Sequence, residues 1–163
     1  MSGLRIRPAV ALDRADVADL LRGLSAESAY RRFQTGLGPD PAPGILDALL
    51  PAGLQGGALL AHLERSLVGH GVWRRIGATP VAEIGLVIAD AHQGQGIGTA
   101  LADALVADLA GRGVERVEVF ASATNRAVIA MVQRRAPDAA QKRDGSTVTY
   151  RFPARVGAAR TVA

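Results

Sequence analysis

Three glycines stand where an apolar strand gives way to a helix, and they constrain the fold more than any other feature of the 163-residue chain. The strand spans Val81–Ile88, and Gly94, Gly96 and Gly98 follow in the segment "QGQGIG" that opens the helix. Glycine is a poor helix former, by about 1 kcal/mol relative to alanine. At a helix start, unpaired N–H groups point outward and the helix dipole favours an anion. The junction is therefore typical of a phosphate-binding loop.

Two common phosphate-binding motifs do not fit this loop. A P-loop ends in Gly-Lys-Ser/Thr, and the loop contains no lysine. The dinucleotide motif Gly-x-Gly-x-x-Gly/Ala fails from either starting glycine, because its third position is Thr99 or Leu101. Tight packing of the helix on the strand is an alternative use of the glycines, although three in five residues exceed what packing requires.

Apolar periodicity and turn residues predict the order of the remaining elements. Strands are expected within residues 4–9, 57–76 (two strands around a turn at 64–66), 81–88, 114–121 and 147–152, and helices over 14–24, 25–35, 45–50, 98–113 and 124–136. Asp13 and Ser25 are the expected caps of the first two helices. Asp144-Gly145 predicts a hairpin turn before the last strand. This order indicates an α/β or α+β domain with a mixed sheet.

Length and composition set the broad class. The chain suits a single domain over residues 1–155, followed by a flexible tail over 156–163. No apolar run is long enough to span a membrane, no signal peptide is visible, and the absence of cysteine excludes disulfides and thiolate metal sites. A cytoplasmic protein, monomeric or homodimeric and without a metal, is expected. The net charge of +4 favours anionic ligands, but scattered basic residues and six aromatic residues argue against nucleic acid.

The stretch Gln93–Gly98 resembles the Arg/Gln-x-x-Gly-x-Gly/Ala signature of the GNAT superfamily of acetyl-CoA-dependent N-acetyltransferases. The apolar strand before the loop, the helix and strand after it, and Asn125 at the start of the next helix follow the family order. The resemblance covers most of the chain. It implies a GNAT-type mixed, mostly antiparallel twisted central sheet with helices on both faces.

The same resemblance implies acetyl-CoA as cosubstrate and a set of residues that bind it. The loop backbone would wrap the pyrophosphate, and the strand after Gly85 would pair with the amides of the pantetheine arm. Asn125 would position the cofactor or a water molecule while also capping its helix. The expected cofactor-binding residues are Leu86, Val87, Ile88, Gln93, Gly94, Gln95, Gly96, Ile97, Gly98, Thr99 and Asn125.

Acetyl transfer to an amine needs a base, because a free alkyl amine is mostly protonated at neutral pH. Glu83 is the only carboxylate in a strand that is expected to be buried on both faces, and burial would raise its pKa. The alternative is an ion pair of Glu83 with an arginine that holds the sheet together. His70 is a candidate for the acceptor-site wall and Asp90 for orienting the loop. Without cysteine there is no acyl-enzyme nucleophile, so the amine is expected to attack directly in a ternary complex.

The chain departs from the family pattern at the group that protonates the leaving thiolate. The family tyrosine position is Val132, and the Gly-Phe after the helix is replaced by Ala136-Pro137. The only tyrosines, Tyr30 and Tyr150, lie elsewhere. Water or another side chain would then supply the proton, or the thiolate would leave unaided. A protein that binds coenzyme A without catalysis is the alternative.

The segment Leu24–Phe33 resembles the Leu-Ser-x-Glu-Ser-x-Tyr-x-Arg-Phe stretch of bacterial Pat-type protein lysine acetyltransferases. The resemblance implies a protein lysine as acceptor and a catalytic glutamate that works without the family tyrosine. A small-molecule amine is the alternative acceptor. The segment could also be merely a packed helix, with Tyr30 and Phe33 turned inward and Arg31 and Arg32 in solvent.

Overall fold

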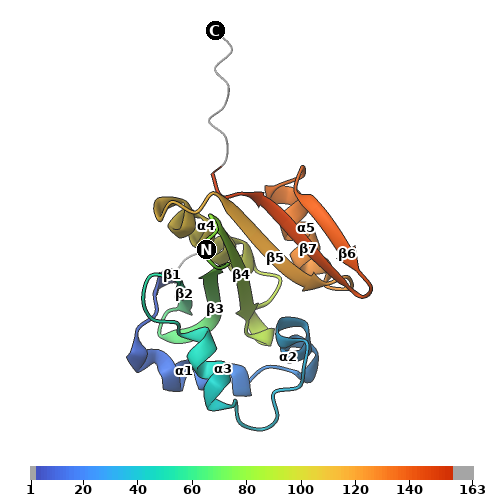
Figure 1. The fold of residues 1–163 in the computed structure, drawn as a ribbon. Coiled ribbons are helices and arrows are strands. Elements are labelled where there is room, and N and C mark those ends of the chain that lie inside the picture. Colours follow the sequence, from blue (N-terminus) through green and yellow to red (C-terminus); the bar gives the residue numbers. More distant parts are fainter. Residues whose placement is uncertain (1–2, 156–163) are drawn as a thin grey trace.

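The computed structural model describes residues 3–155, so the tail expected over 156–163 lies outside the described residues. Its centre is one seven-stranded sheet (Figure 1). The strands are β1 (Leu4–Pro8), β2 (Gly56–Leu63), β3 (Ser66–Arg75), β4 (Val81–Ile88), β5 (Arg116–Ser122), β6 (Ala140–Asp144) and β7 (Thr147–Pro153). Their order is β1-β2-β3-β4-β5-β7-β6, and only the β4–β5 pair is parallel. The expected mixed, mostly antiparallel sheet is confirmed.

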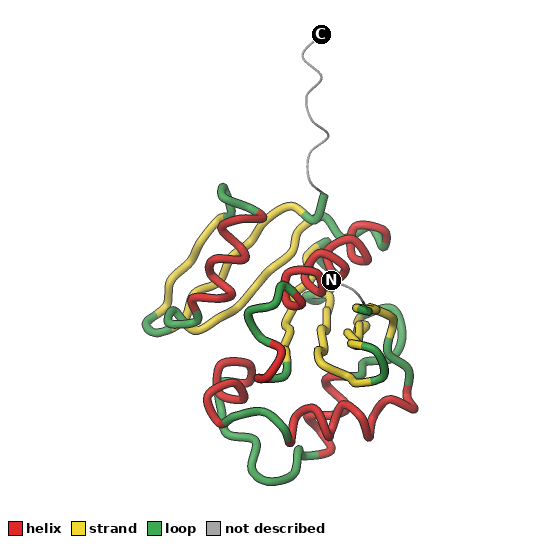
Figure 2. The backbone as a smooth tube through the Cα atoms, turned by 180° about the vertical axis from the view of Figure 1, so that it is seen from behind, coloured by secondary structure: helices red, strands yellow, loops and turns green. Residues whose placement is uncertain are grey.

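Helices cover both faces of the sheet (Figures 1 and 2). They are α1 (Arg14–Arg22), α2 (Ala26–Phe33), α3 (Pro43–Leu49), α4 (Ile97–Gly111) and α5 (Arg126–Arg135), with short 3₁₀ turns η1 (Ala11–Asp13) and η2 (Asp90–His92). Successive residues of a strand point to opposite faces. Leu60 and Val72 accordingly pack with α1 and α3, whereas Leu59 and Trp73 pack with α4. None of the helices in residues 3–155 is long and apolar enough to cross a membrane.

The helix caps test the local predictions. Ser25 Oγ accepts the Ser28 N–H at the start of α2, and Asn125 Oδ1 accepts the Val128 N–H at the start of α5, as expected. Asp13 occupies the N-cap position of α1, as expected, but its carboxylate accepts no hydrogen bond from the first turn of that helix. It instead receives both terminal guanidinium nitrogens of Arg7, at 2.6 and 3.0 Å, and the Val10 N–H at 2.7 Å. A buried ion pair with Arg7 outcompetes the cap.

The last hairpin contains a strand that the sequence pattern did not reveal. β6 is exposed along its whole length and carries the polar run "AQKRD", so it lacks the apolar alternation of a half-buried strand. The turn after Asp144 does close the hairpin, with Gly145 at a positive φ of 57°. The β5–β7–β6 part of the sheet is covered by α5 on one face, where Val132 joins the core.

Candidate active site

The sheet splays open between its only parallel pair of strands. β4 and β5 pair over Val81–Ile84 and Arg116–Val119. Beyond that point β4 stays on β3 as far as Ile88, while β5 follows β7 (Figure 1). In the described part of the chain, the β5-facing edge of residues 85–88 therefore has no strand partner. Such an open edge can accept an extended ligand that carries amide groups.

The glycine loop leads from the end of β4 into α4. Gly94 and Gly96 have positive φ values of 72° and 83°, which side chains with a Cβ rarely adopt, and Gly96 is the N-cap of α4. Ala100 N–H donates to Gly96 O, and the backbone N–H groups of residues 94–99 find no acceptor within residues 3–155. At Gly98 a Cβ would lie 3.6 Å from Ile88 Cγ1, which is an ordinary van der Waals contact, so packing of α4 against β4 does not itself require a glycine there. A bare helix N-terminus with free donors fits an anion such as a pyrophosphate.

A cleft of about 780 Å³ joins the open strand edge to the glycine loop. This volume suits a cofactor-sized ligand. Ile97 is buried under the helix, and the Gln95 side chain donates to Ala91 O outside the cleft. The remaining predicted cofactor-binding residues all line it: Leu86, Val87, Ile88, Gln93, Gly94, Gly96, Gly98, Thr99 and Asn125.

Glu83 lies on the wall of the same cleft, two residues before the open edge begins. The expected burial is wrong, because the Glu83 side chain is exposed. The alternative ion pair is absent too, as Glu83 has no salt-bridge or hydrogen-bond partner among residues 3–155. Its cross-strand neighbour Arg74 donates to Ala48 O instead. The carboxylate is thus free to accept a proton from a ligand.

A model of the acetyltransferase (GNAT) family matches residues 26–136, more than half of the chain. The chain belongs to this family. The acetyltransferase uses acetyl-CoA as its cosubstrate, and the free loop donors and the open strand edge fit the two parts of that molecule expected to bind there. Among curated protein sequences, none matches the acetyltransferase.

Solved structures share the fold of the acetyltransferase at low identity. The GNAT domain of S. lividans PAT is 24% identical, with a TM-score of 0.83 over 92% of this chain and 90% of that chain. The yncA structure from Salmonella typhimurium, which contains its cofactor acetyl-CoA, is 15% identical, with a TM-score of 0.70 over 99% and 100%. The ribosomal-protein-S18-alanine N-acetyltransferase from Escherichia coli is 13% identical, with a TM-score of 0.70 over 96% and 97%.

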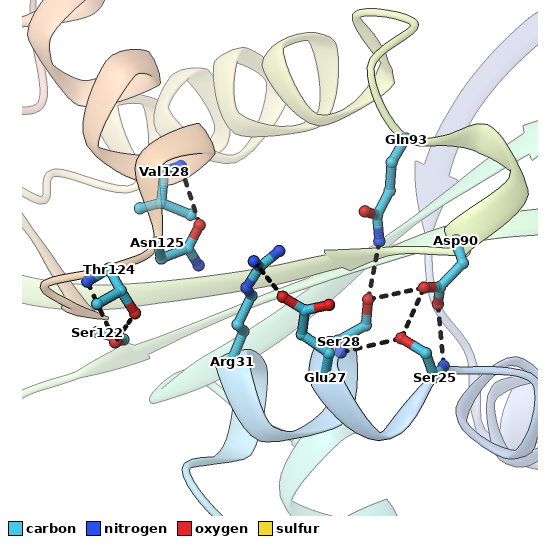
Figure 3. A network of polar contacts seen from close by, with 10 residues as sticks. All are labelled: Ser25, Glu27, Ser28, Arg31, Asp90, Gln93, Ser122, Thr124, Asn125 and Val128. Atoms are coloured by element: carbon cyan, nitrogen blue, oxygen red, sulfur yellow. Dashed lines mark hydrogen bonds and ion pairs between the residues drawn. The ribbon is translucent and has the colours of Figure 1, made fainter.

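A polar network connects α2 of the acetyltransferase to the glycine loop (Figure 3). Asp90 accepts hydrogen bonds from the Ser25 N–H, Ser25 Oγ and Ser28 Oγ at 3.1, 2.7 and 3.0 Å. Gln93 Nε2 donates to Ser28 Oγ and to Ile88 O. Burial alone would raise the pKa of Asp90, but these hydrogen bonds together lower it below the usual range. The amide nitrogen of Gln93 is thus used within the protein and is not available to a ligand.

Arg32 is a site residue that the sequence pattern missed. Tyr30 is 56% exposed, whereas Arg32 turns into the cleft, opposite to the arrangement expected of a simply packed helix. Its guanidinium lies flat against β4, where a Cβ on Gly85 would be only 2.8 Å from Arg32 Cζ. Burial lowers the pKa of Arg32, nearby Glu83 raises it, and Arg74 lowers it further. The signal in the sequence is the i, i+4 spacing of Ser28 and Arg32 on one helix face.

No tyrosine reaches the cleft. Val132 is buried against the core at the position of the family tyrosine, and Tyr150 is only 4% exposed. Tyr30 lies outside the cleft lining. His70 is not a cleft residue either, since it is fully buried with Nε2 2.7 Å from Leu49 O, and burial lowers its pKa to about 4. It is neutral and fastens β3 to the end of α3.

Proposed function

We propose that this acetyltransferase acetylates lysine side chains of proteins, with Glu83 as the general base. In this reaction Glu83 takes a proton from the lysine ammonium and passes it to solvent, and the amine nitrogen then forms a bond to the acetyl carbon. The bond from that carbon to sulfur breaks, and Glu83 takes the second proton that the nitrogen loses as it becomes an amide. The electron pair leaves with the sulfur. The base acts directly or through one water molecule.

The proposed cofactor site uses backbone rather than side chains. The free N–H groups of residues 94–99 would hold the pyrophosphate, and the open edge of residues 86–88 would hydrogen-bond the pantetheine amides. Asn125 lines the cleft at the start of α5, but its Oδ1 is engaged with the Val128 N–H, which leaves its Nδ2 donor for the ligand. Acetyl-CoA bound in this way supplies the activated acetyl group.

The observation that carries the proposal is the exposure of Glu83 beside an uncovered sheet face. Glu83 is in register with Glu118 of β5, so the two carboxylates and Phe120 point to the same side. Glu118 is paired with Arg151, and Phe120 is 52% exposed although it lines the cleft. An exposed aromatic side chain beside the base is the kind of anchor that a protein surface uses. A long lysine side chain can reach Glu83 from there.

Two further points support a protein acceptor. The segment Leu24–Phe33 resembles that of Pat-type protein lysine acetyltransferases, and the GNAT domain of S. lividans PAT shares the fold. The net charge of +4 suits lysines on acidic protein surfaces.

The experiment is to incubate the enzyme with acetyl-CoA and a cytosolic extract and to map acetyl-lysine by mass spectrometry. We expect discrete lysines to gain acetyl groups, and the Glu83→Gln variant to leave them at the level of a heat-treated control. A panel of small amines is assayed in parallel for thiol release. Turnover of a small amine without any acetylated lysine would contradict the proposal.

A further inference from the structure

Arg32 is a cation without a partner in the middle of the active-site cleft. It takes part in no hydrogen bond or ion pair among residues 3–155, and its Nε is buried without an acceptor. Its neighbour Arg31, by contrast, pairs with Glu27 (Figure 3). Leaving a buried donor on a charged group unpaired is unfavourable, because the group loses its hydration without gaining an acceptor. A cost of this kind in a cleft indicates that the missing partner is a ligand.

The position of Arg32 is fixed from three sides. Its Cζ lies 5.0 Å from the centroid of the Phe33 ring. Gly85 offers a flat backbone surface without a Cβ, and the guanidinium occupies that surface. The Asp90 network anchors the start of the helix that carries it. The guanidinium therefore cannot swing toward Glu83 without leaving these contacts.

The contact with Gly85 places Arg32 on β4 between the proposed base and the proposed cofactor-binding segment. Two residues earlier on β4 is Glu83, where the amine is proposed to lose its proton, and the next residue, Leu86, begins the segment proposed to hold the pantetheine arm. The charged or titratable groups facing Arg32 are Glu83 on β4, and Arg74 and the neutral His70 on β3. None of them neutralises it by direct contact.

We propose that Arg32 is a catalytic cation that stabilises the negative charge developing on the carbonyl oxygen and then on the departing sulfur. This inference rests on the proposed function. As the nitrogen–carbon bond forms and the carbon–sulfur bond breaks, the electron pair goes to sulfur, the second proton of the nitrogen goes to Glu83, and the guanidinium would stabilise the new thiolate. Charge stabilisation by Arg32 takes the place of the proton that a tyrosine at position 132 would donate.

The test measures the pKa of the thiol of bound coenzyme A directly, and it needs no amine acceptor. The protein has no cysteine, so the ultraviolet thiolate absorbance of bound coenzyme A has no background from protein thiols. A parallel titration with desulfo-coenzyme A, which lacks the thiol, removes the contribution of the two tyrosines. We expect the wild type to lower the pKa of the bound thiol below that of free coenzyme A. Arg32→Met should raise it by about one pKa unit or more, and Arg32→Lys should keep most of the effect.

Two other variants make the outcome decisive. Gly85→Ala keeps the charge but pushes the guanidinium away from β4, and we expect it to raise the thiol pKa as well. Arg22→Met removes the same charge from the exposed Asp19–Asp40 cluster and should titrate like the wild type. If Arg32→Met fails to bind coenzyme A, Gly85→Ala decides. A thiol pKa unchanged by Arg32→Met, or by Gly85→Ala in that case, would overturn the inference.

The two proposals fail separately. If the pKa of the bound thiol is lowered but no lysine is acetylated, the role proposed for Arg32 stands and the proposal of a protein-lysine acceptor is wrong. With an accepted amine in hand, Arg32→Met should lower kcat by about 10²-fold while the KM for acetyl-CoA changes little. If Arg32 had a merely structural role, Arg32→Met would change neither the thiol pKa nor kcat relative to the KM for acetyl-CoA.

Discussion

Ser28 on α2 and Gln93 at the start of the glycine loop are joined by a hydrogen bond of 3.1 Å from Nε2 to Oγ. The same Gln93 nitrogen donates to Ile88 O at 2.9 Å, and Ser28 Oγ donates to Asp90. One amide group thus connects α2, the end of β4 and the cofactor loop. The helix that carries Arg32 is held in fixed relation to the loop that carries the free N–H groups.

The first prediction concerns this connection. Ser28→Ala removes one hydrogen bond from Gln93 and one from Asp90, which keep their bonds to Ile88 O and to Ser25, and this loss should lower the free energy of unfolding by about 1–3 kcal/mol. It should also weaken acetyl-CoA binding, because the loop and α2 lose their common anchor. Chemical denaturation and calorimetry measure the two effects. Ser66→Ala, at the exposed first residue of β3, is the control. Equal behaviour of both variants would mean that the connection is incidental.

The second prediction concerns the cofactor loop. Gly96→Val places a Cβ at a φ of 83° on the bare N-terminus of α4, so acetyl-CoA affinity should fall by about 10–100-fold through loss of charge-assisted hydrogen bonds. Gly113→Val is the matched control, since Gly113 has a φ of 77° beyond the opposite end of the same helix. Both variants should lose similar stability, and only the first should lose the ligand by calorimetry. Full affinity in Gly96→Val would exclude the loop as the pyrophosphate site.

The third prediction concerns the base. Glu83→Gln keeps the shape of the side chain and removes the proton acceptor, so turnover at neutral pH should fall by about 10²–10⁴-fold. Activity should recover as pH rises, because free amine then becomes abundant, and acetyl-CoA affinity should hardly change. Glu118→Gln is the control, being the neighbouring carboxylate on the same sheet face but paired with Arg151. Unchanged turnover in Glu83→Gln at pH 7 would reassign the carboxylate to structure.

The fourth prediction concerns stability in acid. The ion pair with Arg7 lowers the pKa of Asp13 to about 2 from its ordinary value of 3.8, even though burial opposes the shift. Because the folded pKa is the lower one, the stabilisation is complete above about pH 4 and disappears as pH falls toward 2. Asp13→Asn should therefore cost about 2 kcal/mol at pH 7 and progressively less in acid. Urea denaturation of both proteins between pH 7 and pH 3 measures the difference. A gap that stays constant with pH would exclude the ion pair as its cause.

The sequence predicted the sheet, the glycine loop and two of three caps because each depends on local chemistry. Ser25 and Asn125 cap their helices through neighbouring backbone N–H groups. Asp13 did not follow its local preference, since Arg7, six residues earlier at the end of β1, supplied a stronger partner. This competition depends on how the chain turns between β1 and α1, which the residue pattern alone does not specify.

The same limit applies to the active site. Glu83 was correctly placed on β4, but its exposure depends on the splay of β4 from β5, which only the assembled sheet reveals. Arg31 and Arg32 are identical in type and adjacent in sequence, and the local signals that distinguish them are only the i, i+4 spacings of Arg31 with Glu27 and of Arg32 with Ser28. Arg32 turns inward because Gly85, on a distant strand, leaves room for its guanidinium.

The splay between β4 and β5 has a mechanical consequence. Only four residues of each strand join the β1–β4 half of the sheet to the β5–β7–β6 half. With a pantetheine chain in the proposed place, the ligand would fill the gap between β4 and β5 and extend the short run of hydrogen bonds that joins these two strands. Each turnover would then form and break the hydrogen bonds between the ligand and the open edge of β4. Release of coenzyme A would therefore cost the protein, as well as the ligand, these hydrogen bonds.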